Sequence, residues 1–229
     1  MTNRGDEFLA VYNKFYDWLK SRYFDTITYG DALYEAVKTD QLIRQHSTFL
    51  KKMGHLRNAI VHEDRLLQQV IAEPRPDIIE QFSKICDLIY NPPKAIDMCD
   101  GRRPEILSCN AFLREALFRM RENDYSQIII ENKDDSYGLL TRDTVAKWFE
   151  ANIKQDIVSI KETRLSDIVR HQNPDAACFI GRSASFFDVR EMFASPKNIV
   201  QAVIITHSGK ETEKPLGILT PADMMKEGV

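Results

Sequence analysis

An internal repeat in the second part of the chain limits its possible folds more than any other feature. Two β-branched runs, 128–130 and 203–205, are too short for helices. Each is followed by a polar turn and then by a second short apolar run, 137–141 in the first copy and 216–220 in the second. Apolar runs that flank a polar turn are typical of β-hairpins, so two hairpins are predicted.

The offset between the two copies grows only where turns are expected. It is 73 residues from Leu113 to Phe186 and 79 from Gly138 to Gly217. Homologous copies show this pattern because loops absorb insertions at little cost. Helices are expected at 112–121 and 144–151 in the first copy and at 186–193 and 221–226 in the second. The unit is strand, helix, strand, strand, helix. One unit buries little core, so we expect the two to pack sheet to sheet.

The first ninety residues carry helical periodicity instead. Four aromatic and aliphatic residues recur at spacings of four, three and four, on one face of a helix: Phe8, Tyr12, Phe15 and Leu19. We expect a second helix capped by Asp31 and reaching Ile43, and a third that begins near Ser47 or Thr48 and reaches Leu67. Gly54 permits a bend in the third helix. A fourth, from 78 to 89, stops before Pro92.

The overall charge excludes a protein attracted to nucleic acid by a general positive field. Thirty-one basic and 34 acidic residues give a formal charge of −3, so any contact with RNA must be local. No apolar run approaches the roughly 18 residues that span a bilayer, and the first residues lack the apolar segment of a signal peptide. We therefore expect a cytoplasmic protein that makes no membrane contact.

The repeated unit ends in the segments Gly138-Leu139-Leu140-Thr141-Arg142-Asp143 and Gly217-Ile218-Leu219-Thr220-Pro221-Ala222-Asp223. With its order and spacing, it resembles the cystathionine-β-synthase-type (CBS) domain, and the pair resembles the tandem arrangement called a Bateman module. The resemblance implies two clefts between the sheets that hold adenosine ligands such as AMP, ADP, ATP or S-adenosylmethionine.

The resemblance also implies which residues bind. The Thr after the last strand contacts phosphate and the Asp three residues later holds the ribose hydroxyls, which assigns Thr220 and Asp223 in the second copy. Ala202 and Val203 would flank the base, with Ile180 as a weaker candidate.

The first copy departs from this pattern. It has Thr141, but the position three residues later is Thr144 and the acid is Asp143. We therefore favour the second copy as the binding site. The alternative interpretation is that Thr220 caps the last helix and Asp223 adds negative charge to its first turn.

The helical part contains the motif Arg57-Asn58-Ala59-Ile60-Val61-His62. It is similar to the Arg-x4-His signature of the higher eukaryotes and prokaryotes nucleotide-binding (HEPN) domain. That resemblance implies a dimeric helical bundle and, in many members, a metal-independent endoribonuclease. Arg57 would stabilise charge on the phosphate, Asn58 would orient the other groups, and His62 would transfer a proton, leaving a 2′,3′-cyclic phosphate.

Helical geometry places Asn58 and His62 one turn apart on one face, whereas Arg57 lies about 140° round from His62. A second subunit could complete such a site. The alternative is a polar helix face on which Arg57 pairs with Asp64 or another acid. No ligand spacing in the sequence indicates a metal.

Together these features predict an α plus α/β chain. Residues 1–91 form a four-helix HEPN-like bundle, and residues 94–153 and 154–229 form two βαββα CBS repeats. The predicted function is an adenine-nucleotide-sensing module that regulates a metal-independent ribonuclease, in a homodimer that contacts RNA but not DNA. The alternatives are a non-catalytic nucleotide-binding sensor and a dimerisation adaptor.

Overall fold

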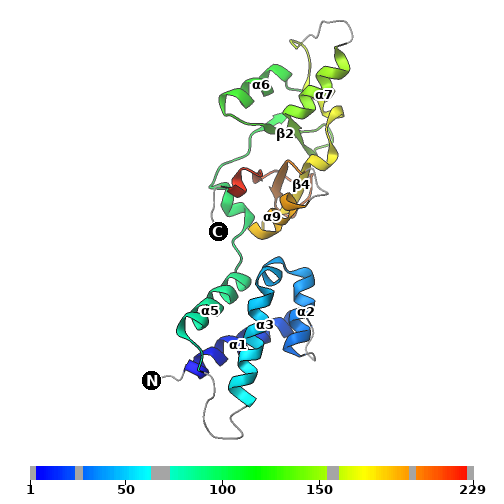
Figure 1. The fold of residues 1–229 in the computed structure, drawn as a ribbon. Helices are drawn as coiled ribbons and strands as arrows, with labels where there is room; N and C mark the ends of the chain where they lie inside the picture. The colour runs from blue at the N-terminus through cyan, green and yellow to red at the C-terminus, as the bar shows by residue number, and fades with distance from the viewer. Residues whose placement is uncertain (1–3, 24–27, 63–72, 154–159, 196–199, 226–229) are drawn as a thin grey trace. The chain divides into compact units, whose positions relative to one another are not determined.

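The computed structural model describes residues 4–23, 28–62, 73–153, 160–195 and 200–225 of the chain. The chain falls into two compact units, residues 1–93 and 94–229. In Figure 1 the first unit is coloured from blue to blue-green and the second from green to red.

The described residues of the first unit form four helices: α1 (Arg4–Tyr23), α2 (Tyr29–Thr39), α3 (Gln41–His62) and α5 (Pro76–Tyr90). The apolar face predicted for α1 is confirmed, because all four of its residues are buried. Phe82 of α5 meets two of them, with ring centroids 5.8 Å from Phe8 and 6.0 Å from Phe15. An aromatic core therefore joins the first helix to the last.

The second and third helices begin earlier than the sequence predicted. Thr28, not Asp31, is the N-cap of α2: its hydroxyl accepts from the Asp31 N–H, and the Asp31 carboxylate accepts from the Thr28 N–H. This reciprocal arrangement is a capping box, in which the acid belongs three positions inside the helix. Asp40 accepts from the Ile43 N–H at 3.0 Å, so Ile43 belongs to α3 and not to α2. Leu67, to which the third helix was predicted to extend, lies outside the described residues.

Gly54 allows a close side-chain approach. Helix α3 continues through this position. A Cβ atom at residue 54 would lie 2.8 Å from Cε1 of Tyr29, well inside van der Waals contact. The Tyr29 hydroxyl donates to the Leu50 carbonyl at 2.8 Å, which fixes the ring across the helix. The glycine is therefore explained by the position of Tyr29.

The second unit contains two three-stranded sheets of the same topology. The first has the order β1 (Ile106–Ser108), β2 (Gln127–Glu131), β3 (Tyr137–Thr141), and the second has the order β4 (Ala177–Gly181), β5 (Ala202–Thr206), β6 (Gly217–Leu219). In each sheet the first two strands are parallel and the last two antiparallel. Both predicted hairpins are confirmed, since Ile129 pairs with Leu139 and Ile204 with Ile218.

Helices follow the strands in the predicted order, with one difference at the end of the chain. Helices α6 (Leu113–Glu122), α7 (Arg142–Asn152) and α9 (Phe186–Ala194) match the predicted segments within two residues. The last segment, expected as a helix over 221–226, is a single 3₁₀ turn, η4 (Asp223–Met225), and residue 226 lies outside the described part of the chain.

The two sheets pack against each other, as the repeat predicted. Five buried residues make this contact: Ile129, Leu139, Ala176, Ala202 and Ile204. Each sheet also has a second core on its other face, where its own helices pack.

The segments that lead into the two sheets are exchanged, which the predicted boundary between 153 and 154 does not capture. The 3₁₀ turn η1 (Ala95–Cys99) precedes β1 but packs with Val203 and Leu219 of the second sheet. Conversely, α8 (Leu165–Ile168) precedes β4 but packs with Trp148 and other residues of the first core. Turns η2 (Val169–His171) and η3 (Pro174–Ala176) then lead into β4. Each sheet is therefore covered in part by the segment that leads into the other sheet.

None of the helices in the described ranges combines the length and the apolar character that crossing a bilayer requires.

The contact between residue 54 and Tyr29 predicts that Gly54→Ala destabilises the protein, although alanine is the better helix former. Displacing a hydrogen-bonded ring should cost about 1–3 kcal/mol. Thermal unfolding followed by circular dichroism would measure this, and the near-ultraviolet tyrosine signal should change. Gly30→Ala is the control, because a Cβ there meets only Thr28 Oγ1, at 3.8 Å. A Gly54→Ala variant as stable as the wild type would contradict this account.

Candidate functional site

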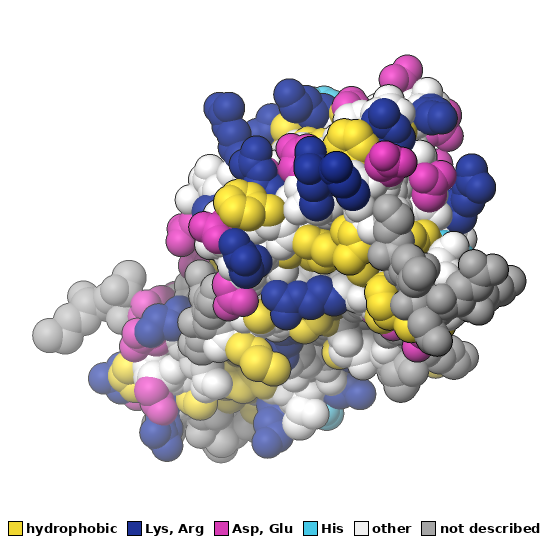
Figure 2. Space-filling view, turned by 90° about the horizontal axis from the view of Figure 1, so that it is seen from above, with side chains coloured by type: hydrophobic (Ala, Val, Ile, Leu, Met, Phe, Trp, Pro, Cys, Tyr) yellow, Lys and Arg dark blue, Asp and Glu magenta, His cyan; other side chains and the backbone are white. Residues whose placement is uncertain are grey.

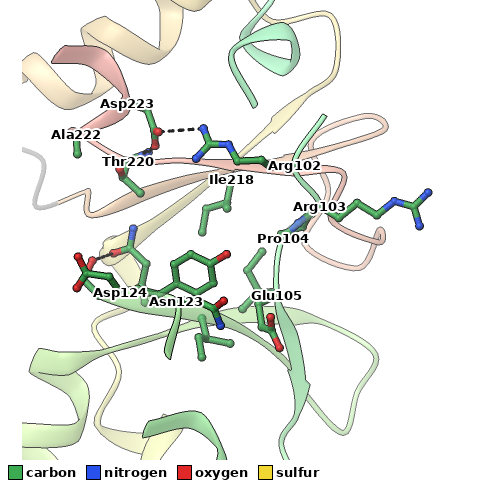
Figure 3. A pocket seen from close by; sticks show the side chains of 15 residues that line it. Arg102, Arg103, Pro104, Glu105, Asn123, Asp124, Ile218, Thr220, Ala222 and Asp223 are labelled. Atoms are coloured by element: carbon green, nitrogen blue, oxygen red, sulfur yellow. Dashed lines mark hydrogen bonds and ion pairs between the residues drawn. The ribbon is translucent and has the colours of Figure 1, made fainter. Parts of the chain in front are cut away.

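A cavity of about 360 Å³ in the second unit is bordered by residues from both repeats. In Figure 3 the side chains of Ile218, Thr220 and Asp223 line one side, and those of Glu105, Asn123 and Asp124 line the other. Its remaining lining residues are Arg102, Arg103, Pro104, Tyr125, Ser126, Gln127, Ile128, Ile129 and Ala222. Most of the lining precedes β1 and β2 of the first sheet or follows β6 of the second.

Thr220 and Asp223 form a closed hydrogen-bonded turn at the end of β6. Both the N–H and the hydroxyl of Thr220 donate to Asp223 Oδ2, each at 2.9 Å, and the Asp223 N–H donates to the Thr220 carbonyl at 3.0 Å. The Thr220 hydroxyl therefore donates to Asp223, which differs from the cap interpretation, in which it would accept from a helix N–H. The turn presents the other carboxylate oxygen, Oδ1, away from Thr220.

Arg102 forms an ion pair with that second carboxylate oxygen, Oδ1. Its Nη2 lies 3.3 Å from Asp223 Oδ1, and in Figure 3 its side chain reaches across to the carboxylate, whereas Arg103 extends away. Burial raises the pKa of Asp223, but hydrogen bonds from Thr220 and the charge of Arg102 outweigh burial and place that pKa below its ordinary value. Asp223 is thus an ionised acceptor that forms an ion pair with a solvent-exposed arginine.

The opposite wall combines an aromatic ring with paired charges. Tyr125 is 41% exposed, so its ring is available for contact with a ligand. Glu105 lies 3.3 Å from Arg119, and Asp124 lies 3.8 Å from Arg142, so both acids are partly neutralised. Ile218, which is partly exposed, adds apolar surface.

Sequence reasoning missed Arg102 and Tyr125. Both lie in segments before a strand of the first repeat, and only the packing of the two sheets brings these segments opposite Thr220. The single available signal was the pair of adjacent arginines, Arg102 and Arg103, in a chain of net negative charge.

The residues predicted to flank the base lie elsewhere. Ala202 and Val203 have no exposed surface: Ala202 packs between the sheets and Val203 packs in the core on the other face. Ile180 packs in the same hydrophobic core as Val203. None of the three borders the cavity beside Thr220 and Asp223. The physical reason is that Ala202, Val203 and Ile180 are covered by the cores on the two faces of their sheet, so most of the cavity wall is formed by segments that precede or follow strands.

The corresponding threonines of the first repeat are buried and bonded to each other. The hydroxyls of Thr141 and Thr144 lie 3.0 Å apart, and Thr141 accepts from the Thr144 N–H as the N-cap of α7. Both are less than 5% exposed. Asp143 instead pairs with Lys147 at 2.7 Å on the helix surface. This arrangement differs from that at Thr220 and Asp223.

The three residues of the helical motif lie on the last turns of α3. Arg57 Nη1 donates to Asn58 Oδ1 at 3.3 Å, and both residues border a separate cavity within the helical unit. His62 is the last residue of α3. Asp64, the alternative partner of Arg57, lies outside the described residues. The described chain therefore joins Arg57 to Asn58 but leaves His62 one helical turn away.

No cluster of three or more His, Cys, Asp and Glu side chains suited to a metal is found within the described ranges.

Comparison with known proteins identifies part of the second unit. Residues 101–151 match the family model of the CBS domain. Among curated protein sequences no match was found.

Three solved structures of similar proteins come from different organisms. A CBS-domain protein of unknown function from Kribbella flavida has 11% identity, covers 58% of this chain and 97% of its own, and has a TM-score of 0.44. A conserved CBS-domain protein of unknown function from Thermoplasma acidophilum has 16% identity, coverages of 61% and 71%, and a TM-score of 0.46. A hexameric CBS-CP12 protein from bloom-forming cyanobacteria has 16% identity, coverages of 60% and 73%, and a TM-score of 0.45.

The match covers β1, α6, β2, β3 and most of α7, the complete first strand-helix-strand-strand-helix unit. The chain therefore contains a CBS domain at residues 101–151.

Proposed function

We propose that the second unit is a tandem CBS module that binds an adenosine ligand and regulates the helical unit. The observation that carries this proposal is the joint cavity, which is lined by Thr220 and Asp223 of one repeat and by Tyr125 of the other. A concave site that combines apolar walls with a few polar groups is the usual form of a small-molecule site.

The cavity offers a binding group for the ribose, the base and the phosphate of an adenosine ligand. The Asp223 carboxylate can accept from two ribose hydroxyls, since it is held ionised by Thr220 and Arg102. The ring of Tyr125 and the side chain of Ile218 offer contact to the base. Arg102 can turn from Asp223 to a phosphate, for which a guanidinium is suited.

Arg102 also supplies a route to the helical unit. Its N–H and its Nε both donate to the Cys99 carbonyl, at 2.8 and 3.2 Å, which ties it to η1. Residue 94, directly before η1, is the first residue of the second unit. A ligand that replaces Arg102 as the partner of Asp223 would free Arg102, which is bonded to η1, the segment that follows the helical unit. Such a ligand would regulate the helical unit only if it bound with different affinity to the active and inactive states.

We expect Asp223→Ala to weaken adenosine-ligand binding at least tenfold, because the ribose hydroxyls lose a charged acceptor. Calorimetry of the full chain with AMP, ADP, ATP and S-adenosylmethionine would measure this. Asp143→Ala is the matched control, since Asp143 follows the last strand of the other repeat but is paired on the surface. An equal loss in both variants, or no heat with any of the four ligands, would contradict the proposal.

A second candidate function, for the helical unit, is metal-independent RNA cleavage of the HEPN type. The observation that favours it is the position of Arg57 and Asn58, which are bonded to each other at the edge of a cavity that also has Lys51 and His55 on its border. A cationic site of this kind can hold a phosphate, and His62 would transfer the proton from an adjacent turn or from a second subunit.

Incubation of the full chain with structured and single-stranded RNA in EDTA tests the ribonuclease. Cleavage to a 2′,3′-cyclic phosphate should be lost in His62→Ala, because a neutral methyl cannot transfer a proton. His171→Ala, in the other unit, should leave it unchanged. Cleavage that survives in His62→Ala, or no cleavage with any added adenine nucleotide, would exclude this function.

Self-association through the first repeat is the third part of the proposal. Three large apolar side chains on α6 and α7 are more than a third exposed: Leu117, Phe118 and Phe149. Figure 2 shows hydrophobic side chains at the surface, interspersed with Lys and Arg side chains. Apolar surface of this kind is typical of interfaces, and a second copy of the chain would cover it in a homodimer.

We expect Phe118→Glu to shift the full chain towards the monomer in analytical ultracentrifugation, because a carboxylate would be buried in the interface. Leu216→Glu, at an exposed apolar residue remote from these helices in sequence, should not shift it. A wild-type chain that sediments as a monomer at all concentrations would contradict the homodimer.

A further inference from the structure

Two amide side chains of the described chain, Asn123 and Gln127, border the cavity of the candidate adenosine site. Both ends of the Gln127 amide are occupied. Its Nε2 donates to the Gln201 carbonyl at 3.4 Å, and its Oε1 accepts from the Ser126 hydroxyl at 3.5 Å. Gln127 therefore ties the start of β2 to the second repeat.

The amide of Asn123 is held at one end only. Its Nδ2 donates to the Arg119 carbonyl at 3.0 Å, one turn back along α6. A carbonyl can only accept, so the amide nitrogen must face it, and this contact fixes the direction in which the amide points. Asn123 is exposed, and Figure 3 shows its side chain on the cavity wall opposite Thr220 and Asp223. The amide atom that a ligand can reach is therefore Oδ1, an acceptor.

The end of α6 fixes the positions of Asn123 and Tyr125. Asn123 is the C-cap of this helix, and the next residue, Asp124, has a φ of 53°. The Tyr125 N–H donates to the Met120 carbonyl at 2.8 Å, and the Asp124 N–H donates to the Arg121 carbonyl at 3.4 Å. These two bonds form a Schellman motif, in which a helix ends on a left-handed residue. The amide and the ring thus belong to one turn that is held by backbone bonds.

The charged acceptors on this wall already have cationic partners. Glu105 lies 3.3 Å from Arg119, and Asp124 lies 3.8 Å from Arg142. Asn123 Oδ1 differs from both because it is a neutral acceptor. A neutral acceptor suits a donor that carries no charge, such as an amino group attached to an aromatic ring.

We infer that Asn123 determines the specificity of this site for the base, with its Oδ1 accepting a hydrogen bond from the amino group at C6 of adenine. The inference rests on the proposed function, which places the base beside Tyr125. Asn123 and Tyr125 are two residues apart, so their Cα atoms lie within about 8 Å and a base beside the ring is within reach of the amide. A purine without this amino group offers no donor, so Oδ1 would lose hydration without gaining a partner.

Asn152 provides a matched control for Asn123. It is the last residue of α7, and its Nδ2 donates to the Trp148 carbonyl at 2.7 Å, also one turn back along its helix. Asn152 does not border the cavity. Asn123→Ala and Asn152→Ala therefore remove the same kind of hydrogen bond at a helix end, but only Asn123→Ala removes an acceptor from the candidate site.

Calorimetry of the full chain with AMP and with purine riboside 5′-monophosphate provides the measurement. The second nucleotide is AMP with hydrogen in place of the amino group. The wild type should bind AMP about fivefold more tightly, because the analogue lacks one hydrogen bond. In Asn123→Ala the two affinities should lie within about twofold of each other, whereas Asn152→Ala should keep the wild-type preference. Asp223→Ala should weaken both nucleotides by the same factor, since they share the ribose.

The possible outcomes separate this inference from the proposed function. No heat with either nucleotide would contradict both. Equal affinity of the wild type for the two nucleotides would contradict the inference alone, and so would a preference for AMP that persists in Asn123→Ala. A preference that is lost in both Asn123→Ala and Asn152→Ala would show that the helix ends, and not Asn123 Oδ1, determine it.

Discussion

The contact between the two sheets is the interaction on which the second unit depends. Ile129 and Leu139 of the first sheet pack against Ala202 and Ile204 of the second, with no exposed surface on any of them. Burial of apolar area is the main favourable term in folding, so this contact sets which strand ends face each other. As a result, the end of β6 faces the segments before β1 and β2, and the candidate adenosine site lies between them.

The exchange of leading segments makes the two repeats depend on each other. Turn η1 packs into the second core, where a Cβ atom on Gly217 would lie 2.5 Å from Cys99 Sγ, so only glycine leaves room for this approach. Arg102 follows η1 closely and is bonded to the Cys99 carbonyl, which directs it to Asp223. One tight backbone contact thus positions the arginine, and the arginine in turn contributes to the ionised state of the carboxylate.

Most of the charged side chains at the candidate adenosine site are already paired. In the second unit four of the five charged residues that line the cavity beside Thr220 are in ion pairs: Arg102 with Asp223, Glu105 with Arg119 and Asp124 with Arg142. A ligand there must exchange one ion pair for another, which suits a reversible sensor.

The sequence by itself determined the element order, the repeat, both hairpins and the buried face of α1, because each rests on local periodicity. It also predicted Thr220 and Asp223 as ligand-binding residues, and these two belong to one local turn of four residues. Tertiary structure decided the rest. Ala202 and Val203 were expected beside a ligand and are buried instead, while Tyr125 and Arg102 meet their partners only through contacts distant in sequence. Periodicity shows which side of an element is apolar, but which element covers that side depends on how the whole chain packs.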